Sequence, residues 1–488
     1  MESQTQTTVR NAGFLVLLRG AQVASGFLFA TFIPRLMGPD TYGQYNLLAS
    51  LALWFTMASE LGFTQVMARY GPRLAHDRSA FKLFFARLLT VRSGSGLIAA
   101  ASYLLLTLLW LRDLDPLVLL FLAGGVCLRA LAHQFFTLFL GVNRADRWGM
   151  AQVMRGWLTL ALLPAGFLLR GLVGAAAAFL LVEASVLLAG IGWGKSHVDW
   201  PRLRRDWPVL GPELRFGLLF FAGGLLQTAF QRSGPALIRA VTGDYAQVGY
   251  FGLANDITMT VAQVFPQVAM AFSAVFVTWL DGGQEQEVRR WAERLSAALA
   301  AGGMVVILAV LFLAEHLVPV VLGAAYRPVT PSLIVLAASL LLLALSNLAH
   351  VLAMVRDRPD IALSSAAVRL AALWIIGPFL IRAEQSLGAS LAALVASVLY
   401  TLFIVVRVQR VMPFSLRRWL LAVALGGVCL PLLWLRSSLP VDSLLFVLSV
   451  AVYAALLLAG RVVTWRELAS AWQMIRPTGG ARASERVP

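Results

Sequence analysis

Six arginines of this 488-residue chain lie inside long apolar segments, where a charged side chain is unfavourable. They are Arg19, Arg92, Arg129, Arg155, Arg232 and Arg369, and the acids in comparable segments are Glu60, Glu183, Asp256 and Glu315. A charge facing lipid costs about 3 kcal/mol on insertion scales, so these side chains are expected to face protein or water. Because a guanidinium offers forked donors that match phosphate oxygens, the embedded positive excess predicts a cationic cavity for an anionic group.

Arg129 is the deepest of these arginines, since it lies about thirteen residues from either end of its segment. We expect it to face the cavity and bind an anion; the alternative is a structural ion pair with Glu183. Arg19 and Arg155 lie nearer a segment end, so snorkelling or structural pairing is the alternative for both. His133, one helical turn beyond Arg129, is either a core histidine or a proton carrier.

Arg19 and Glu60 are expected to form an ion pair. Both lie about seven residues, or roughly 10 Å, from the same end of two consecutive apolar segments. Equal depth on adjacent antiparallel helices makes contact plausible. Such a pair would orient Arg19 for binding, or it would only neutralise the two charges for insertion.

The positions of these residues depend on helices that are long and apolar enough to cross a membrane. Apolar residues make up 59% of the chain, charged residues make up 13%, and the mean hydropathy is +0.78, far from soluble averages. The apolar segments run about 20 to 25 residues, which suffices for a helix to cross a bilayer. About fourteen begin, roughly, at residues 12, 45, 83, 116, 149, 172, 214, 246, 295, 331, 361, 386, 418 and 441. The sequence therefore predicts an all-α polytopic membrane protein.

The formal net charge of +16 is distributed in a pattern along these segments. Lysines and arginines gather in alternate loops, about 27 on one side against about 7 on the other, as the positive-inside rule describes. This predicts cytoplasmic N- and C-termini and an even number of spans. The basic charge thus reports topology and gives no reason to expect nucleic-acid binding.

Two stretches of similar hydropathy indicate an internal repeat, which is typical of transporters. A shift of about 205 residues aligns Gly38 with Gly243 and Tyr45 with Tyr250. The predicted organisation is an N-terminal six-helix lobe (1–193), a basic cytoplasmic linker (194–213), a C-terminal six-helix lobe (214–407), two additional helices (408–462) and a cytoplasmic tail (463–488).

The stretch GPDTYGQYNLLASL, from Gly38 to Leu51, begins with a turn between two apolar segments. Preceded by PRLM and followed by SELGF and ARYGP, it resembles the start of bacterial polysaccharide and O-antigen flippases of the Wzx type. The stretches VPVVLGAAYRPVTPSLIVLAASLLL and YFGLANDITMTVAQVFP are similar to two further segments of that family. The family belongs to the multidrug, oligosaccharidyl-lipid and polysaccharide exporter superfamily.

The resemblance implies two six-helix lobes around a central cavity, with two further helices. It implies that a polyprenyl-pyrophosphate-linked oligosaccharide moves from the inner to the outer leaflet of a bacterial inner membrane, as in lipopolysaccharide biosynthesis. Expected partners are membrane lipids and the polymerase and glycosyltransferases of the same pathway; no cofactor is expected. Polar residues that would meet sugar hydroxyls, or instead tie helices together, are Gln22, Gln227, Gln231, Asn255 and Asn347. The turns at Gly38 and Gly243 would close the outer end of each lobe.

Other functions are less consistent with the residues. A multidrug exporter of the same superfamily is the alternative, but such relatives use an acid in the first span, where this chain has Arg19. A membrane polymerase or ligase would be expected to carry a large catalytic outer loop, so no enzyme is predicted. The run GIGWGKS lacks the first glycine and the context of a phosphate-binding loop. Where the lipid II flippase branch has Ala-Asp-Arg, this chain has Ala254, Asn255 and Asp256, which argues against a peptidoglycan precursor.

Overall fold

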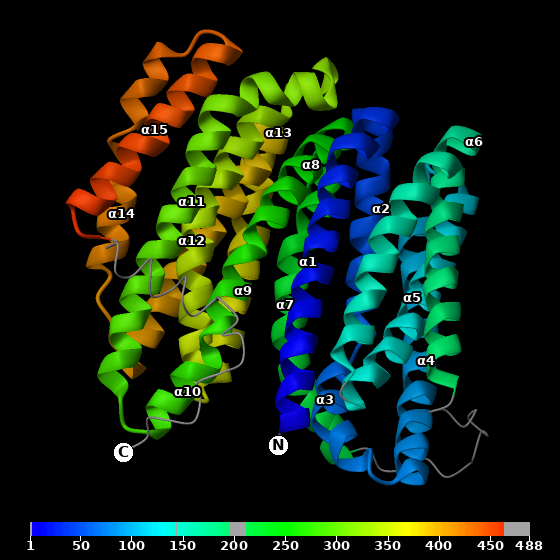
Figure 1. The fold of residues 1–488 in the computed structure, drawn as a ribbon. Helices are drawn as coiled ribbons and strands as arrows, with labels where there is room; N and C mark the ends of the chain where they lie inside the picture. Colours follow the sequence, from blue (N-terminus) through cyan, green and yellow to red (C-terminus); the bar gives the residue numbers. More distant parts are fainter. Residues whose placement is uncertain (1, 143, 196–210, 463–488) are drawn as a thin grey trace.

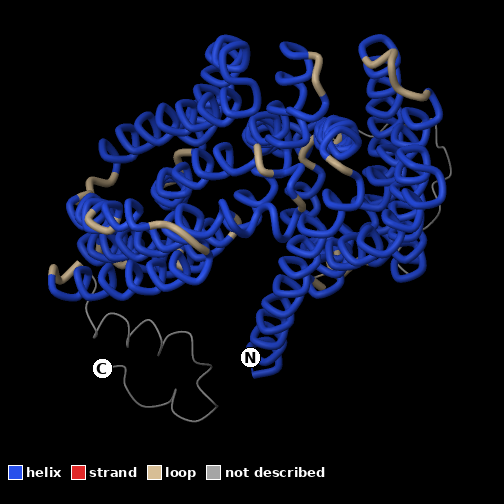
Figure 2. The backbone as a smooth tube through the Cα atoms, turned by 90° about the horizontal axis from the view of Figure 1, so that it is seen from above, coloured by secondary structure: helices blue, strands red, loops and turns tan. Residues whose placement is uncertain are grey.

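The structure is a computed structural model that describes residues 2–142, 144–195 and 211–462. Within these ranges all regular elements are helices and no strand occurs (Figures 1 and 2). The first half of the chain, as the term is used below, forms α1 (Glu2–Met37), α2 (Pro39–Ala58), α3 (Phe63–Leu74), α4 (Arg78–Trp110), α5 (Pro116–Gly141) and α6 (Ala145–Gly194). The second half forms α7 (Gly211–Thr242), α8 (Tyr245–Ala262), α9 (Val264–Ala271), α10 (Ser273–Asp281), α11 (Glu285–Leu322), η2 (Ala324–Tyr326), α12 (Val329–Val355) and α13 (Pro359–Val411). The chain continues with α14 (Arg417–Gly427), η3 (Leu430–Leu435) and α15 (Leu439–Ala459).

Many of these helices are long and apolar enough to cross a membrane. In the described part of the chain, nine helices are long and apolar enough to cross a membrane, and α2 with α3 makes a tenth as a span bent by 42°. The expected all-α polytopic membrane protein is therefore confirmed, whereas the count of fourteen spans stays a prediction.

Two of the longest helices each contain a sharp reversal. In α6 the break lies at Arg170 and Gly171, and in α13 it lies at Gln385, which has a φ of 51°. The two segments of α6 pack side by side, since a Cβ on Gly174 would lie 1.8 Å from the carbonyl oxygen of Gly166. Each of these helices therefore supplies two packed segments.

The connections α1–α2, α7–α8 and α11–α12 lie at one end of the molecule, here called the Gly38 end (Figure 1). Each contains a glycine with positive φ, namely 75° at Gly38, 72° at Gly243 and 101° at Gly323. Side chains with a Cβ rarely adopt this conformation, which explains the glycine in each turn. The opposite end, here called the Asp77 end, contains the α3–α4 connection.

Asp77 shows how the helices begin at its end. Its carboxylate accepts hydrogen bonds from the backbone N–H groups of Ser79 and Ala80 at 2.9 and 3.1 Å, and so caps α4. The Ser79 hydroxyl donates a further bond at 2.7 Å. These bonds lower the pKa of the Asp77 carboxyl, and the bond from the Ser79 hydroxyl has the largest effect.

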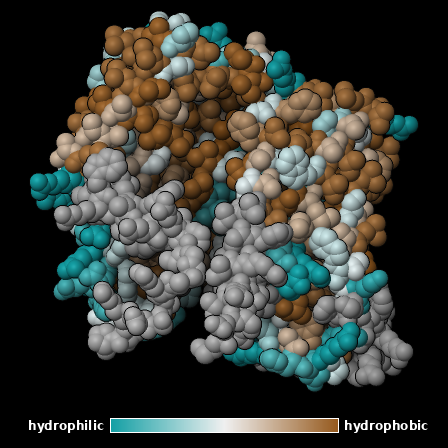
Figure 3. Space-filling view, viewed as in Figure 1, coloured by the Kyte–Doolittle hydropathy of each residue, from teal (hydrophilic) through white to brown (hydrophobic). Residues whose placement is uncertain are grey.

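The apolar core differs between the two ends. At the Gly38 end one cluster joins both halves, with Ile33, Tyr42 and Leu48 from the first half and Val248, Leu253, Val329 and Ile381 from the second. Toward the Asp77 end the core divides: Phe63, Phe85, Phe136 and Phe139 belong to a cluster of the first half, while Phe265, Phe276, Phe312 and Leu348 belong to another. Figure 3 shows a gap between the two bodies on this side, with hydrophilic atoms in its depth. The halves therefore share one apolar core at the Gly38 end and have separate apolar clusters toward the Asp77 end. They still touch there, since a Cβ on Gly62, between α2 and α3, would lie 2.2 Å from the carbonyl oxygen of Gly217 on α7.

Close contact between α2 and α8 joins the halves at the Gly38 end. A Cβ on Gly43 would lie 1.8 Å from the carbonyl oxygen of Tyr245, and one on Gly249 would lie 2.3 Å from that of Pro39. Only glycine allows the two backbones to approach so closely. The Tyr326 hydroxyl adds a hydrogen bond to the Pro34 carbonyl at 2.7 Å.

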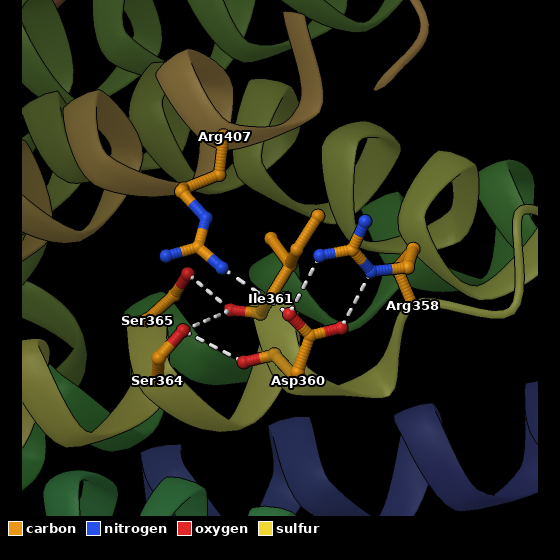
Figure 4. A network of polar contacts seen from close by, with 6 residues as sticks. All are labelled: Arg358, Asp360, Ile361, Ser364, Ser365 and Arg407. Atoms are coloured by element: carbon orange, nitrogen blue, oxygen red, sulfur yellow. Dashed lines mark hydrogen bonds and ion pairs between the residues drawn. The ribbon is translucent and has the colours of Figure 1, made fainter. Parts of the chain in front are cut away.

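Further polar contacts join the halves or fasten helix ends. Arg239 of α7 forms an ion pair with Asp113, between α4 and α5, at 2.9 Å. At the Asp77 end, Asp360 binds Arg358 at 2.8 Å and Arg407 at 3.2 Å, which ties the beginning of α13 to its last turns (Figure 4). Asp360 is half exposed, so solvent screens these ion pairs and we expect them to add little to stability.

Candidate functional site

A layer of charged side chains lies just below the apolar core that both halves share. Arg129 of α5, Glu183 of α6, Arg232 of α7 and Asp256 of α8 each lie ten to thirteen residues from the Gly38 end of their helical segment. At 1.5 Å per residue this places all four at a similar depth of about 15 to 20 Å. The layer therefore lies where the apolar core shared by both halves gives way to two separate apolar clusters.

Glu183 is the centre of the first group of charges. Its side chain is fully buried and accepts two hydrogen bonds from Arg155, at 2.8 Å from Nε and 3.0 Å from Nη2. Arg129 approaches the same carboxylate through Nη1 at 3.3 Å. Gln152 accepts a further bond from Arg155 at 3.1 Å. Two arginines thus share one acid, which leaves this group with a net positive charge.

Arg129 is the member of this group that reaches an open surface. Its side chain is 20% exposed, whereas that of Arg155 is 10% exposed. Its helix, α5, packs against α2, and α2 lies directly against α8 of the second half. Arg129 therefore lies on a helix close to the interface between the halves.

Asp256 is the centre of the second group and receives contacts from both halves. Arg232 approaches its Oδ1 atom through Nη1 at 3.3 Å. Asn46 of α2 donates a hydrogen bond to Oδ2 at 3.0 Å, and the Tyr42 hydroxyl donates one to the same oxygen at 3.3 Å. The side chains of Arg232 and Asp256 are 31% and 25% exposed, so this group is also partly accessible.

The contacts bear on several of the alternatives raised by the sequence. Arg129 does contact Glu183, and it is partly exposed as well, so structural pairing and anion binding are compatible at this position. Arg155 is buried and donates hydrogen bonds from two nitrogens to Glu183. These contacts correspond to structural pairing and not to snorkelling. His133 is half-buried, and its backbone carbonyl accepts a bond from Thr137 at 2.7 Å.

Two arginines expected in the cavity lie inside the protein instead. Arg92 is 1% exposed and donates from Nε to the Ala130 carbonyl at 3.1 Å, between α4 and α5. Arg369 is also 1% exposed; its guanidinium lies 3.7 Å from the centre of the Phe230 ring and donates to Ser397 at 2.9 Å. Sequence depth alone did not reveal these cation–π and backbone contacts, which hold both charges within one half. This conformation does not support their assignment to the substrate cavity.

The other expected residues have different surroundings. Asn347 donates to the Leu343 carbonyl of its own helix at 2.8 Å, and Asn255 is buried. Gln227 and Gln231 are half-buried on α7, on the same helix as Arg232. Glu60 is buried at the break between α2 and α3. Gln22 is half-buried near the middle of α1, while the side chain of Arg19 lies outside the described residues, so its pair with Glu60 stays a prediction.

Tyr42 and Asn46 are site residues that the sequence reasoning missed. They lie four residues apart on α2, and this spacing places them on one helix face, where both reach Asp256. The spacing was visible in the sequence, but their partner belongs to a helix more than 200 residues away. In the described part of the chain, no group of three or more His, Cys, Asp or Glu side chains is placed to hold a metal ion.

Several solved structures have a similar fold. The chain is similar to a lipid II flippase, MurJ, in an inward closed conformation, with a TM-score of 0.72, 11% identity and coverage of 93% of this chain and 100% of that one. It is also similar to an inward-facing multidrug resistance transporter of the MATE family (TM-score 0.65, 16% identity, 80% and 94% coverage) and to the Vibrio cholerae MATE transporter VcmN (0.54, 14%, 84% and 98%). The chain therefore shares the fold of these flippase and MATE transporter structures.

The family follows from the sequence match. Residues 8–280, more than half of the chain, match the polysaccharide biosynthesis protein family. The chain therefore belongs to this family, in agreement with the resemblance of its Gly38 segment. No curated protein shows significant sequence similarity to the chain.

Proposed function

We propose that the protein is a flippase that moves a polyprenyl-pyrophosphate-linked oligosaccharide across a bacterial inner membrane, from the cytoplasmic to the outer leaflet. The observation that carries this proposal is the pair of partly exposed arginines, Arg129 and Arg232, between the two halves of a polysaccharide biosynthesis protein. A pyrophosphate is the anionic part of such a substrate, and the glycan is the part that needs a polar path through the membrane.

Electrostatics favours Arg129 as the main phosphate ligand. Glu183 already accepts two hydrogen bonds from Arg155, and Arg129 approaches it through a single nitrogen at 3.3 Å. A guanidinium carries five N–H donors, so most of those of Arg129 are available to phosphate oxygens. Water exclusion by the apolar core above the layer would strengthen these bonds, because the local dielectric constant is low.

The proposed transport step is a rocking motion of residues from about 12 to 193 against residues from about 214 to 407, which gives alternating access. We assign the Gly38 end to the outer side and the Asp77 end to the cytoplasm, with both termini cytoplasmic. The separate apolar clusters toward the Asp77 end support a state in which the charged layer is reached from the cytoplasm, and the contact between Gly62 and Gly217 keeps α7 against the α2–α3 break in that state. Opening at the Gly38 end would then require the separation of α2 from α8.

A multidrug exporter is the second candidate, and the similarity to MATE transporters favours it. The two functions differ in the charge of the ligand. Arg155 binds Glu183 of the charged layer, so three arginines face the two acids Glu183 and Asp256. This positive excess suits an anion better than the cationic compounds that acidic cavities bind.

The proposal is tested by deleting the gene and identifying the lipid-linked glycan that accumulates in the inner leaflet. The purified protein in vesicles should then move that glycan between leaflets, measured by its accessibility to an added glycosidase. Accumulation of no lipid-linked glycan, together with increased retention of cationic dyes in the deletion strain, would favour the multidrug exporter.

A further inference from the structure

The two carboxylate oxygens of Asp256 are divided between the halves of the chain. Oδ1 contacts Arg232 of the second half at 3.3 Å. Oδ2 accepts hydrogen bonds from Asn46 at 3.0 Å and Tyr42 at 3.3 Å, both from the first half. Asp256 is therefore shared between Arg232, from the same half, and two hydrogen-bond donors on α2.

The contacts to Oδ2 depend on the close approach of α2 and α8. Tyr42 is completely buried and Asn46 is 6% exposed, so both are held in the interface. A Cβ on Gly252 would lie 2.5 Å from the Asn46 side-chain oxygen, which shows how closely the amide lies against α8. Separation of α2 from α8 at the Gly38 end must therefore remove both donors from Asp256.

Arg232 is weakly held in the present state. Its contact with Asp256 is a single one at 3.3 Å, and 31% of its side chain is exposed. Arginine–carboxylate pairs are strongest when two parallel hydrogen bonds form. While Oδ2 is occupied by α2, Asp256 offers Arg232 only one oxygen, and a second becomes available when α2 leaves.

We infer that Tyr42 and Asn46 are positioning residues that set the affinity of Arg232 for the phosphate of the substrate. With the Gly38 end closed, they hold Oδ2, and Arg232 keeps donors for a phosphate oxygen. With that end open, Asp256 binds Arg232 through both oxygens and displaces the phosphate toward the outer side. This inference rests on the proposed function and adds a release step to it. By linkage, a bound anion stabilises the closed state by the same factor.

The first test measures closure without any ligand. Cysteines replace Thr41 on α2 and Ala246 on α8 in a background without Cys127 and Cys429, and the rate of disulfide formation reports contact at the Gly38 end. The double variant Tyr42→Phe with Asn46→Leu should form the disulfide several-fold more slowly. Gln44→Leu is the matched control, because this amide lies on α2 but bonds to Asp40 of the same helix at 3.1 Å. An unchanged rate in the double variant would contradict the inference.

The second test measures anion binding in the disulfide-locked protein, so that closure is constant. The probe is a short-chain polyprenyl pyrophosphate. The Tyr42→Phe, Asn46→Leu variant should bind it about tenfold more weakly, the effect expected of one charge-assisted hydrogen bond. Asp256→Asn should bind it more tightly than the locked parent. When Asp256→Asn is present, the double variant should have no further effect, because its action passes through that carboxylate. A merely structural role would not produce this dependence.

The outcomes separate the inference from the function on which it rests. If the locked parent binds the probe and the double variant binds it equally well, the inference is wrong and the flippase proposal stands. If neither the locked nor the unlocked parent binds the probe, both are wrong. Tyr326→Phe, which removes a hydrogen bond to Pro34 at the Gly38 end away from Asp256, should leave binding by the locked protein unchanged.

Discussion

Arg155 binds both carboxylate oxygens of Glu183, with hydrogen bonds of 2.8 Å from Nε and 3.0 Å from Nη2, and thereby joins the two segments of α6. Glu183 is completely buried, and Arg155 is buried as well. A carboxylate in such surroundings needs a partner, because its charge is otherwise uncompensated. This pair separates the structural role of Arg155 from the role of Arg129, which contacts the same acid from an exposed position.

Replacement of Arg155 by Ala should destabilise the protein by about 3 to 5 kcal/mol, the range for breaking a buried ion pair from one side. The unfolding midpoint in detergent, followed by size-exclusion chromatography after heating, measures the loss. Addition of Glu183→Gln should restore part of the stability, since it removes the charge that is left without its main partner. A single variant as stable as the parent would contradict this account of the pair.

Replacement of Arg129 by Ala should abolish glycan export with a much smaller effect on stability, because Glu183 keeps both hydrogen bonds from Arg155. Arg129→Lys should restore only part of the activity, since lysine keeps the charge but loses the forked donors. Export of the surface glycan in a deletion strain is the measurement, and the amount of protein in the membrane is the control. Normal export by Arg129→Ala would remove this residue from the proposed site.

The fold class and the charged residues of the layer were predictable from sequence, because apolar length and embedded charge are local properties. Arg129, Glu183, Arg232 and Asp256 were all identified from depth in an apolar segment. Depth does not show which way a side chain points. Arg92 and Arg369 lie at comparable depth, yet a backbone carbonyl and aromatic rings surround them within one half.

The partners across the two halves were not predictable by the same reasoning. Tyr42 and Asn46 are ordinary turn-proximal residues until α8 is placed beside α2, and that placement depends on the close approach at Gly43 and Gly249. The alignment of Gly38 with Gly243 indicated related turns, and the structure places the helices that follow them in direct contact. The repeat therefore contained information on this interface that residue types alone did not.

A disulfide between cysteines at Thr41 and Ala246 should stop transport reversibly. Both positions are half-buried in the first turns of α2 and α8, which the proposed mechanism must separate. The parent should lack Cys127 and Cys429, which are unpaired thiols. Flipping in vesicles should stop after oxidation and return after reduction, whereas either single-cysteine variant should be insensitive to both treatments. Full activity of the cross-linked protein would exclude alternating access through the Gly38 end.

Gly43→Ala should shift the protein away from the state that is closed at the Gly38 end. The added methyl group would lie 1.8 Å from the Tyr245 carbonyl oxygen and 2.9 Å from the Gly249 backbone nitrogen, so α2 and α8 must move apart to accommodate it. The rate of Thr41–Ala246 disulfide formation should therefore fall. Gly223→Ala is the matched control, since a Cβ there has no atom within 4 Å, and alanine favours a helix by about 1 kcal/mol over glycine. The control should form the disulfide at the parent rate and be at least as stable, and a parent rate in Gly43→Ala would show that the helices do not need this close approach.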